Sequence, residues 1–379
     1  MDNQSEVVVV GGGIGGLAVA NGLARNGFGV RLLERADRFG EVGAGLQLGP
    51  NATRLLRDWG LLDDIIDRGV LPEQLILRDA VDGRVLTSLD LGAEFRRRYQ
   101  APYVVVHRSD LHDVLLTACK EAGVDLLTGH EVADVHLDAD RAQTVCTNGT
   151  TFGSEVVLGL DGVDSGLRST IVGDEKIDSG FVAYRGTMPA DEAPESVDQR
   201  SVVAWLGPDC HLVQYPLRRG DLINQVAVFR TKGRPAGLDQ AFADCCEAVR
   251  AGLGSLWRDR NWPMTDRLPT ATWSHGRIGL LGDAAHPMLQ YLAQGACQAL
   301  EDAQVLTDQA VKHRRDHDWP AVLEETQNIR APRTARTQRT ARIWGEIWHV
   351  EGTARLLRNE LMRTRDRSDH SPIDWLYGV

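Results

Sequence analysis

The sequence predicts an α/β protein in which a parallel-sheet domain is interrupted by an inserted mixed β-sheet and followed by C-terminal helices. Three observations predict this class. An apolar strand, a glycine turn and a helical pattern open the chain, short alternating strands fill its middle, and helical periodicity continues from about residue 303 to the end. The 379 residues exceed the usual size of one domain, so we expect two domains or one domain with a large insertion.

The opening strand, residues 7–10, leads into the pattern G-x-G-x-x-G formed by Gly11, Gly13 and Gly16. In this pattern the first glycine permits a tight turn, and the second lets backbone N–H groups approach a pyrophosphate. The third lets the helix pack close to the strand. Ile14 lies inside the motif, where the helix begins. The segment therefore predicts a site for the phosphates of a nucleotide.

An acidic residue follows at the distance that a dinucleotide site requires. The second strand, residues 29–33, ends at Glu34, whose carboxylate suits the 2′-OH of a ribose and would repel a 2′-phosphate. Arg35 comes next and is expected at the same site. Strand, turn, helix, strand and acid fall in order, which predicts an adenine dinucleotide and leaves both FAD and NAD open.

Composition narrows the class of protein further. The formal charge of −11 argues against a nucleic-acid surface, and the Arg-rich stretch 330–342 is typical of a helix face. No apolar stretch is long enough to cross a bilayer and no signal peptide precedes the first strand, so we expect a cytoplasmic protein. The cysteines show no C-x-x-C pair, which indicates neither a disulfide framework nor a metal site. They are Cys119, Cys146, Cys210, Cys245, Cys246 and Cys297.

A second glycine-rich turn covers residues 39–48 and includes Gln47. Such turns let backbone lie against a flat ligand. Further along, a strand over residues 104–107 ends where a helical pattern begins, and Arg108 sits at that start.

Two more buried strands each end in a glycine and an acid. Asp161 and Gly162 follow the strand 155–160, and Gly282 and Asp283 end the strand at 277–281. Asp283 suits a ligand hydroxyl beside backbone N–H groups that face phosphate. Both aspartates also suit the plain role of a helix N-cap, and the binding and capping roles can coexist. The neighbouring His286 is expected to help fix the second loop.

These four segments, in this order, resemble the FAD-dependent aromatic hydroxylases, the single-component flavoprotein monooxygenases related to para-hydroxybenzoate and salicylate hydroxylases. The resemblance spans nearly the whole chain. It implies a Rossmann-like FAD-binding domain of the GR2 type, non-covalent FAD, O₂, and NADH or NADPH as a transient co-substrate. The FAD-binding residues it implies are Gly11, Gly13, Ile14, Gly16, Glu34, Arg35, Gln47, Arg108, Asp161, Gly162, Gly282, Asp283, Gly295 and Ala296.

The inserted region differs from a nucleotide fold. It shows short alternating strands at residues 181–186, 201–206, 210–216 and 223–229, typical of a sheet that binds substrate. We therefore expect a discontinuous FAD-binding domain and a separate substrate-binding domain. The expected bounds are 1–72, 101–180 and 274–330 for the first, 73–100 and 181–273 for the second, and 331–379 for a C-terminal helical segment.

A finer resemblance links residues 207–218, 287–296 and 344–349 to the para-hydroxylating, gentisate-forming members of this family. Gln290 carries part of it, because many relatives have proline there and an amide can bind a phenol or a carboxylate. The resemblance implies that reduced flavin and O₂ give a C4a-hydroperoxide that attacks an electron-rich ring, with 3-hydroxybenzoate converted to gentisate.

The protein must then polarise the phenol and exclude water. His211 and Tyr215 lie four apart on one strand and face the same side. We expect His211 to act as base or phenol partner, Gln290 to orient the substrate and Tyr215 to line the pocket. The alternatives are a structural role for His211 and for Gln290, and a core position for Tyr215.

Other functions stay open. Salicylate, another phenol or a natural product is an alternative substrate. A flavin oxidase or dehydrogenase without oxygen insertion, or a non-catalytic FAD-binding protein, would use the same domain. A plain NAD dehydrogenase would leave the Asp161 and Asp283 segments without a role. The sequence does not choose between NADH and NADPH, and its Trp-rich C-terminal helices leave room for a homodimer contact.

Overall fold

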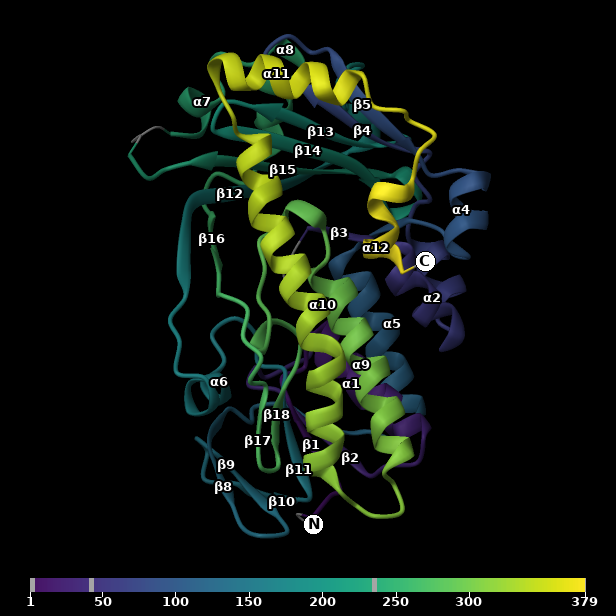
Figure 1. Ribbon diagram of the computed structural model, residues 1–379, viewed down its shortest axis with the longest axis vertical. Coiled ribbons are helices and arrows are strands. Elements are labelled where there is room, and N and C mark those ends of the chain that lie inside the picture. Colours follow the sequence, from purple (N-terminus) through teal and green to yellow (C-terminus); the bar gives the residue numbers. More distant parts are fainter. Residues whose placement is uncertain (1–3, 41–43, 234–236, 379) are drawn as a thin grey trace. The chain divides into compact units, whose positions relative to one another are not determined.

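The structure, a computed structural model, describes residues 4–40, 44–233 and 237–378. Residues 41–43 of the predicted glycine-rich turn lie outside the described residues. The chain forms two compact units, each built from three segments (Figure 1). Unit 1 comprises residues 1–42, 109–177 and 266–339, and unit 2 comprises residues 43–108, 178–265 and 340–379.

Unit 1 contains a six-stranded sheet in the order β17-β18-β11-β1-β2-β7. All neighbouring strands pair in parallel except β17 with β18. Parallel sheets are covered on both faces, which explains why the central strands are apolar throughout and fully buried. The strands are β17 (Ser274–His275), β18 (Ile278–Leu280), β11 (Val156–Gly159), β1 (Val7–Val10), β2 (Val30–Leu33) and β7 (Asp125–Leu127).

Helices α1 (Ile14–Arg25) and α9 (Gly295–Lys312) pack against each other in this unit (Figure 1). An antiparallel three-stranded sheet of order β10-β9-β8 completes it. The remaining elements that contribute to unit 1 are β8 (Val132–Leu137), β9 (Ala142–Cys146), β10 (Thr151–Ser154), α5 (Arg108–Glu121), α6 (Gly166–Ile171) and α10 (Trp319–Trp348).

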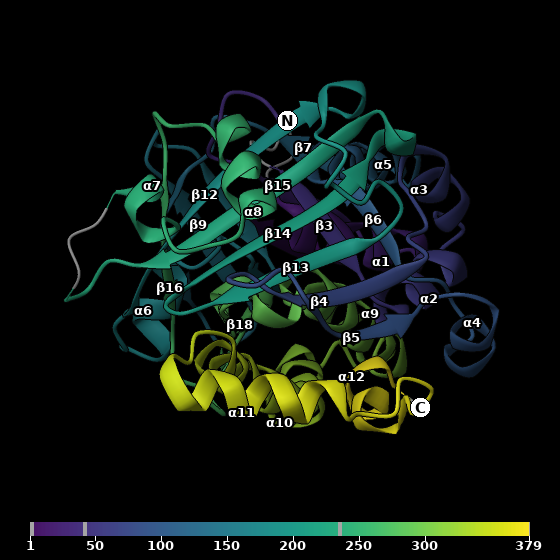
Figure 2. The ribbon, with the colours of Figure 1, turned by 90° about the horizontal axis from the view of Figure 1, so that it is seen from above.

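Unit 2 is built on a seven-stranded mixed sheet of order β16-β12-β15-β14-β13-β4-β5 (Figure 2). The four strands predicted between residues 181 and 229 are all present, and together with the parallel sheet of unit 1 they confirm the predicted fold class. The strands are β16 (Trp262–Asp266), β12 (Ile177–Pro189), β15 (Leu222–Arg230), β14 (Cys210–Leu217), β13 (Val202–Gly207), β4 (Gln74–Asp79) and β5 (Val85–Asp90).

The two faces of this sheet bury different clusters, because alternate residues of a strand point to opposite faces. On β14, Cys210 and Leu212 join a core that includes α7 (Leu238–Ala241) and α8 (Glu247–Gly252). Tyr215 and Leu217 join the opposite cluster. That second cluster includes residues of α4 (Ala93–Tyr99), β6 (Val104–His107) and α12 (Asp374–Tyr377).

The segments of the two units differ from the expected domain bounds, most extensively before residue 73 and after residue 339. Residues 44–72 fold in unit 2, where β3 (Gly45–Leu48) pairs with β6 and Arg54 of α2 (Pro50–Asp58) donates to the carbonyl of Tyr377. They were expected in the FAD-binding domain. A short helix α3 (Leu62–Arg68) follows. The cause is long-range pairing, which local sequence does not encode.

The C-terminal residues 340–378 also fold in unit 2 rather than as a separate segment. Helix α11 (Gly352–Arg363) contacts β5 and runs beside the sheet (Figure 2). The fully buried Asp79 accepts hydrogen bonds from Arg355 (2.6 and 2.8 Å) and Asn359 (2.6 Å) of this helix. In the part of the chain that the structure describes, no helix combines the length and apolar character needed to cross a bilayer.

Candidate functional site

The turn between β1 and α1 is closed so tightly that only glycine fits at two positions. Gly11 has φ +107°, and a Cβ there would lie 2.4 Å from the carbonyl oxygen of Leu160. A Cβ on Gly16 would lie 1.9 Å from the carbonyl oxygen of Gly11. The structure thus places a tight turn at Gly11 and the close approach of helix and strand at Gly16, as the motif requires.

The N-terminus of α1 has the features of an anion site. Gly13 occupies the N-cap position and supplies no side-chain cap, and the first turn carries no acidic residue. The first N–H groups of the helix are therefore available to a phosphate, and the helix dipole favours negative charge there. The side chain of Ile14 is buried, so this residue contributes its backbone to the site and its side chain to the core.

Glu34 lies at the mouth of the same turn. Its Oε2 accepts from the N–H of Gly12 at 2.7 Å and its Oε1 from the N–H of Ala36 at 2.8 Å. The carboxylate is half-buried, which leaves it within reach of a ribose, whereas Arg35 is exposed on the following loop. The buried His112 bonds through Nε2 to the carbonyl of Gly12 at 2.8 Å, a support that motif analysis missed.

Asp161 follows β11 and has two different carboxylate oxygens. Oδ2 accepts from the N–H of Gly166, the first residue of α6 (3.0 Å), but the N-cap residue of this helix is Ser165, whose hydroxyl accepts from the N–H of Arg168. Oδ1 is buried and has no hydrogen-bond partner among the described residues. Gly162 has φ +85°, which favours glycine. A free acceptor beside the nucleotide turn fits a cofactor hydroxyl, and the part played by Asp161 in binding stays a prediction.

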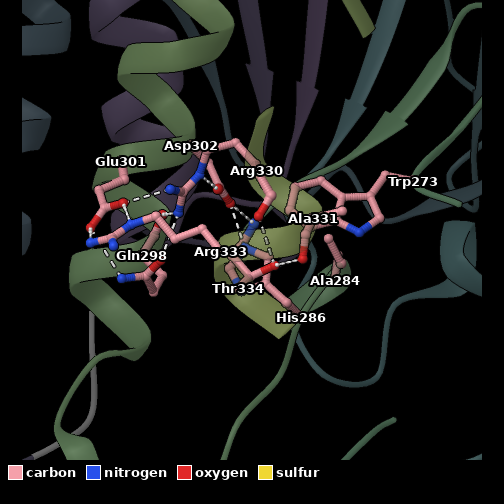
Figure 3. A network of polar contacts seen from close by, with 12 residues as sticks. Trp273, Ala284, His286, Gln298, Glu301, Asp302, Arg330, Ala331, Arg333 and Thr334 are labelled. Carbon is pink, nitrogen blue, oxygen red and sulfur yellow. Dashed lines mark hydrogen bonds and ion pairs between the residues drawn. The ribbon is translucent and has the colours of Figure 1, made fainter. Parts of the chain in front are cut away.

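A buried ionic network holds the loop of Gly282 and Asp283 (Figure 3). The fully buried Asp302 of α9 accepts from the N–H of Gly282 (2.9 Å), from Nε2 of His286 (2.6 Å) and from Nε of Arg330 (2.7 Å). Burial opposes ionisation, but the neighbouring His286 and Arg330 outweigh it and lower the pKa of Asp302 to about 2. Asp302 is therefore ionised, and His286 helps fix the loop, as expected.

Arg330 extends the same network. Its Nη1 donates to Glu301 at 2.5 Å and its Nη2 to Oε1 of Gln298 at 2.8 Å (Figure 3). Arg330 lies on α10 as the Arg-rich stretch predicted, but it is buried and ion-paired rather than part of an exposed face. From the other side, the buried Arg168 donates to the carbonyls of Ala284 (2.8 Å) and Ala285 (2.5 Å).

Sequence reasoning missed Asp302, Arg330 and Arg168. A signal existed for the first, because helical spacing places Asp302 on the same face as Gln298 and Leu306, and this face is buried. A carboxylate on a buried helix face needs a partner, and the partner lies 28 residues away on another helix.

The loop after β18 leads to Gln290. This residue is half-buried in a short 3-10 helix, Gln290–Leu292, and Ala293 follows with φ +52°. Gly295 and Ala296 form the first turn of α9, whose N-terminus has no side-chain cap. The cofactor-binding residues predicted in unit 1 thus lie at the starts of α1 and α9 and at the ends of β2, β11 and β18.

Unit 2 holds the other predicted residues. Gln47 on β3 accepts from the hydroxyl of Tyr103 at 2.8 Å, and Arg108 begins α5 with its N–H bonded to the carbonyl of Ala44 at 3.1 Å. Arg185 of β12 carries a second guanidinium. Burial and Arg108 lower the pKa of Arg185, against the opposing effect of Tyr215. The guanidinium groups of Arg108 and Arg185 therefore lie close enough for the charge of Arg108 to lower the pKa of Arg185.

His211 and Tyr215 lie on β14 and share a face, as their spacing predicts. Both are buried, and Tyr215 packs so closely on Gly45 that a Cβ there would lie 2.4 Å from its ring. Burial, and then His349, lower the pKa of His211 well below its ordinary value. Burial raises the pKa of Tyr215. His211 is therefore neutral near pH 7, and the catalytic roles of both residues stay predictions.

Comparison with known proteins gives the family of this chain. Residues 4–341 match the family described as FAD binding domain. The chain is 38% identical to the 3-hydroxybenzoate 6-hydroxylase of Polaromonas naphthalenivorans (strain CJ2), over 100% of this chain and 97% of that protein. It is 36% identical to the 3-hydroxybenzoate 6-hydroxylase of Klebsiella oxytoca, over 100% of this chain and 98% of that protein.

Solved structures agree on the fold. Klebsiella pneumoniae HpxO complexed with FAD and uric acid superposes with a TM-score of 0.86 at 23% identity, covering 95% of this chain and 93% of that one. A salicylate hydroxylase substrate complex superposes with a TM-score of 0.82 at 26% identity, covering 100% of this chain and 96% of that one.

The chain therefore belongs to the FAD-binding family of flavoproteins. Within it, the protein is a single-component FAD-dependent aromatic monooxygenase similar to the 3-hydroxybenzoate 6-hydroxylases. The turn at Gly11, the uncapped start of α1 and the free acceptor on Asp161 all fit FAD.

Proposed function

We propose that this protein hydroxylates 3-hydroxybenzoate para to its hydroxyl group, giving gentisate, with NADH or NADPH as the reductant. The observation that carries the proposal is identity of 36–38% across the full chain with relatives that bear this activity in their names. The presence of His211, Tyr215 and Gln290 in the segments that resemble gentisate-forming enzymes supports it.

The residues of unit 1 would hold the cofactor. Backbone N–H groups at the start of α1 bind phosphate, Glu34 accepts from the adenosine ribose, and Asp161 and Asp283 accept from further hydroxyl groups. FAD, when bound, accepts a hydride from the nicotinamide and activates O₂ for transfer to the ring. The network around Asp302 keeps the Gly282 loop in one conformation, so its backbone is arranged before the ligand arrives.

In unit 2, His211 would hold the phenol. A neutral imidazole can accept the phenolic proton at Nε2, which makes the ring more electron-rich and directs attack to the para carbon. Tyr215 would line the same side of the sheet, where its raised pKa keeps it a neutral hydrogen-bond donor near pH 7. The amide of Gln290, in unit 1, would orient the substrate through a hydrogen bond. The dry surroundings of His211 would also exclude water.

Purified protein with NADH and NADPH, offered 3-hydroxybenzoate, salicylate and 4-hydroxybenzoate in parallel, tests the proposal. We expect gentisate from 3-hydroxybenzoate, and a loss of kcat of about 100-fold in His211→Ala. Catechol from salicylate would move the assignment to the salicylate alternative. Cofactor oxidation that yields only H₂O₂ with all three phenols would exclude them as substrates.

A homodimer and a cytoplasmic location also stay predictions. Helix α11 of unit 2 exposes Leu356, Leu357 and Leu361, each by more than 60%, and this apolar strip supports a contact between two copies. Light scattering coupled to gel filtration would give the mass of the particle. A particle of twice the chain mass of 41.6 kDa is the predicted result, and a monomer at all concentrations would contradict it.

A further inference from the structure

His211 has a buried partner of its own kind. Its Nδ1 lies 2.8 Å from Nε2 of His349, which follows the last residue of α10. The ring planes are inclined by only 21° and the ring centres are 5.0 Å apart, so the bonded nitrogens lie between the two centres. This is an edge-to-edge hydrogen bond rather than a stack. The two side chains are 1% and 5% exposed, respectively.

Two contacts hold His349 in place, one through its ring and one through its backbone. Its ring stacks on Phe181 with centres 4.4 Å apart, and its carbonyl accepts from the N–H of Asp209 at 3.1 Å. The guanidinium of Arg230 lies 4.6 Å from the centre of the Phe181 ring and pairs with Asp209 at 2.6 Å. Such a held imidazole can fix the orientation and proton position of its partner.

The charges around the two histidines disfavour a further positive charge on His349. Arg230 on β15 and Arg358 on α11 face His349, and Asp209 and Asp79 partly balance them. Burial, and then Arg230 and Arg358, lower the pKa of His349 to about 3. Both rings are therefore neutral near pH 7, and the hydrogen bond between them holds one proton.

Either His211 or His349 can carry the proton of this hydrogen bond, and the two arrangements have opposite consequences for Nε2 of His211. If Nδ1 of His211 donates to His349, then Nε2 of His211 has no proton and can accept one from a phenol. If Nε2 of His349 donates instead, Nε2 of His211 carries a proton and can only donate. The first arrangement also supports His211 after it accepts a proton, because the resulting imidazolium keeps its Nδ1–H bond to a neutral acceptor.

We propose that His349 is the positioning residue of His211: its Nε2 accepts the Nδ1 proton, which leaves Nε2 of His211 as the base for the substrate phenol. The inference rests on the proposed function of His211. When the phenol O–H bond breaks, the proton forms a bond to Nε2 of His211, and the phenolate retains the electron pair. His349 gains no proton in this step.

The test follows ionisation of bound 3-hydroxybenzoate in the FAD-loaded enzyme by ultraviolet difference spectroscopy as pH is varied. His349→Phe keeps a ring against Phe181 and removes the acceptor. We expect it to raise the apparent pKa of the bound phenol by about one unit and to lower kcat about tenfold, with flavin content unchanged. His349→Gln, whose amide oxygen can accept from Nδ1, should restore both to within about threefold of wild type.

His370→Gln is the matched control, since His370 is another buried histidine of unit 2 that lies among Phe95 and Tyr99. This substitution should change neither the apparent pKa of the bound phenol nor kcat. Equal behaviour of His349→Phe and wild type would overturn the inference, as would a His349→Gln enzyme no better than His349→Phe. A wild-type enzyme that does not bind 3-hydroxybenzoate would overturn it together with the proposed substrate.

Nitrogen-15 NMR of histidine-labelled wild-type protein tests the same point without relying on the His349 variants. The signals of His211 are assigned by their loss in His211→Gln. We expect His211 to carry its proton on Nδ1 in the neutral state. A proton on Nε2 would overturn the inference even if both His349 variants failed to fold.

Discussion

At the residue scale, the molecule places its buried charges where a loop must be held. Asp302 is fully buried and accepts from a backbone N–H, a histidine and an arginine at once. Burying a carboxylate costs free energy that only such a complete set of partners offsets. The result is a rigid support behind the Gly282 loop, whose sequence includes the small residues Gly282, Ala284 and Ala285.

Replacing Asp302 with asparagine should expose the importance of this support. The Asp302→Asn change leaves Arg330 buried with fewer partners, and we expect the free energy of unfolding to fall by about 3 kcal/mol at pH 7. The exposed Asp308 of the same helix is the control, and Asp308→Asn should change it by less than about 0.5 kcal/mol. Urea denaturation measures both. An Asp302→Asn protein as stable as wild type would contradict the assignment.

The carboxylate of Asp302 also predicts that the free energy of unfolding depends on pH. Its pKa in the folded protein, about 2, lies below the ordinary value of 3.8, so the folded state favours the ionised form. The stabilisation is therefore complete well above pH 3.8 and is lost as the pH falls from there through 2. It amounts to about 2 kcal/mol. The difference in stability between wild type and Asp302→Asn should shrink over this range, and a constant difference would contradict the assigned pKa.

At the element scale, two adjacent glycines that follow the β1–α1 turn have different surroundings. A Cβ on Gly16 would meet a backbone oxygen at 1.9 Å, whereas one on Gly15 would meet the side-chain tip of Leu160 at 3.0 Å. We expect Gly16→Ala to lose bound FAD, because the helix must move away from the strand, and Gly15→Ala to retain it. The absorbance ratio of flavin to protein measures the content. Equal retention in the two variants would show that the turn is more pliable than the geometry indicates.

Some features of the fold and of the site could be predicted from the sequence, and others could not. The glycine pattern, the strands of the inserted sheet and the shared face of His211 and Tyr215 follow from local spacing, so they could be predicted. The bond between His211 and His349 joins residues 138 positions apart, and that between Asp302 and Arg330 joins two helices. Periodicity within one element does not encode such pairs, and the pairing of β3 with β6 was not predicted for the same reason.

At the scale of the whole molecule, unit 1 is assembled from three distant segments, each of which contains predicted cofactor-binding residues. A ligand that binds such residues should stabilise the folded chain as a whole. We expect removal of FAD to lower the midpoint of thermal unfolding. Adding FAD at 100 times its Kd should raise the free energy of unfolding by about 2.7 kcal/mol. FMN lacks the adenosine ribose that Glu34 is expected to bind and should restore much less. Glu34→Gln should weaken the FAD effect and leave that of FMN unchanged, whereas equal effects of FAD and FMN would contradict the assignment of Glu34.

Oxygen transfer to a defined carbon is the central claim, and an ¹⁸O₂ experiment tests it most directly. The purified protein is supplied with NADH, 3-hydroxybenzoate and ¹⁸O₂, and the product is identified by chromatography and mass spectrometry. The account predicts gentisate carrying one ¹⁸O atom. Unlabelled gentisate, or labelled H₂O₂ with 3-hydroxybenzoate recovered unchanged, would contradict it.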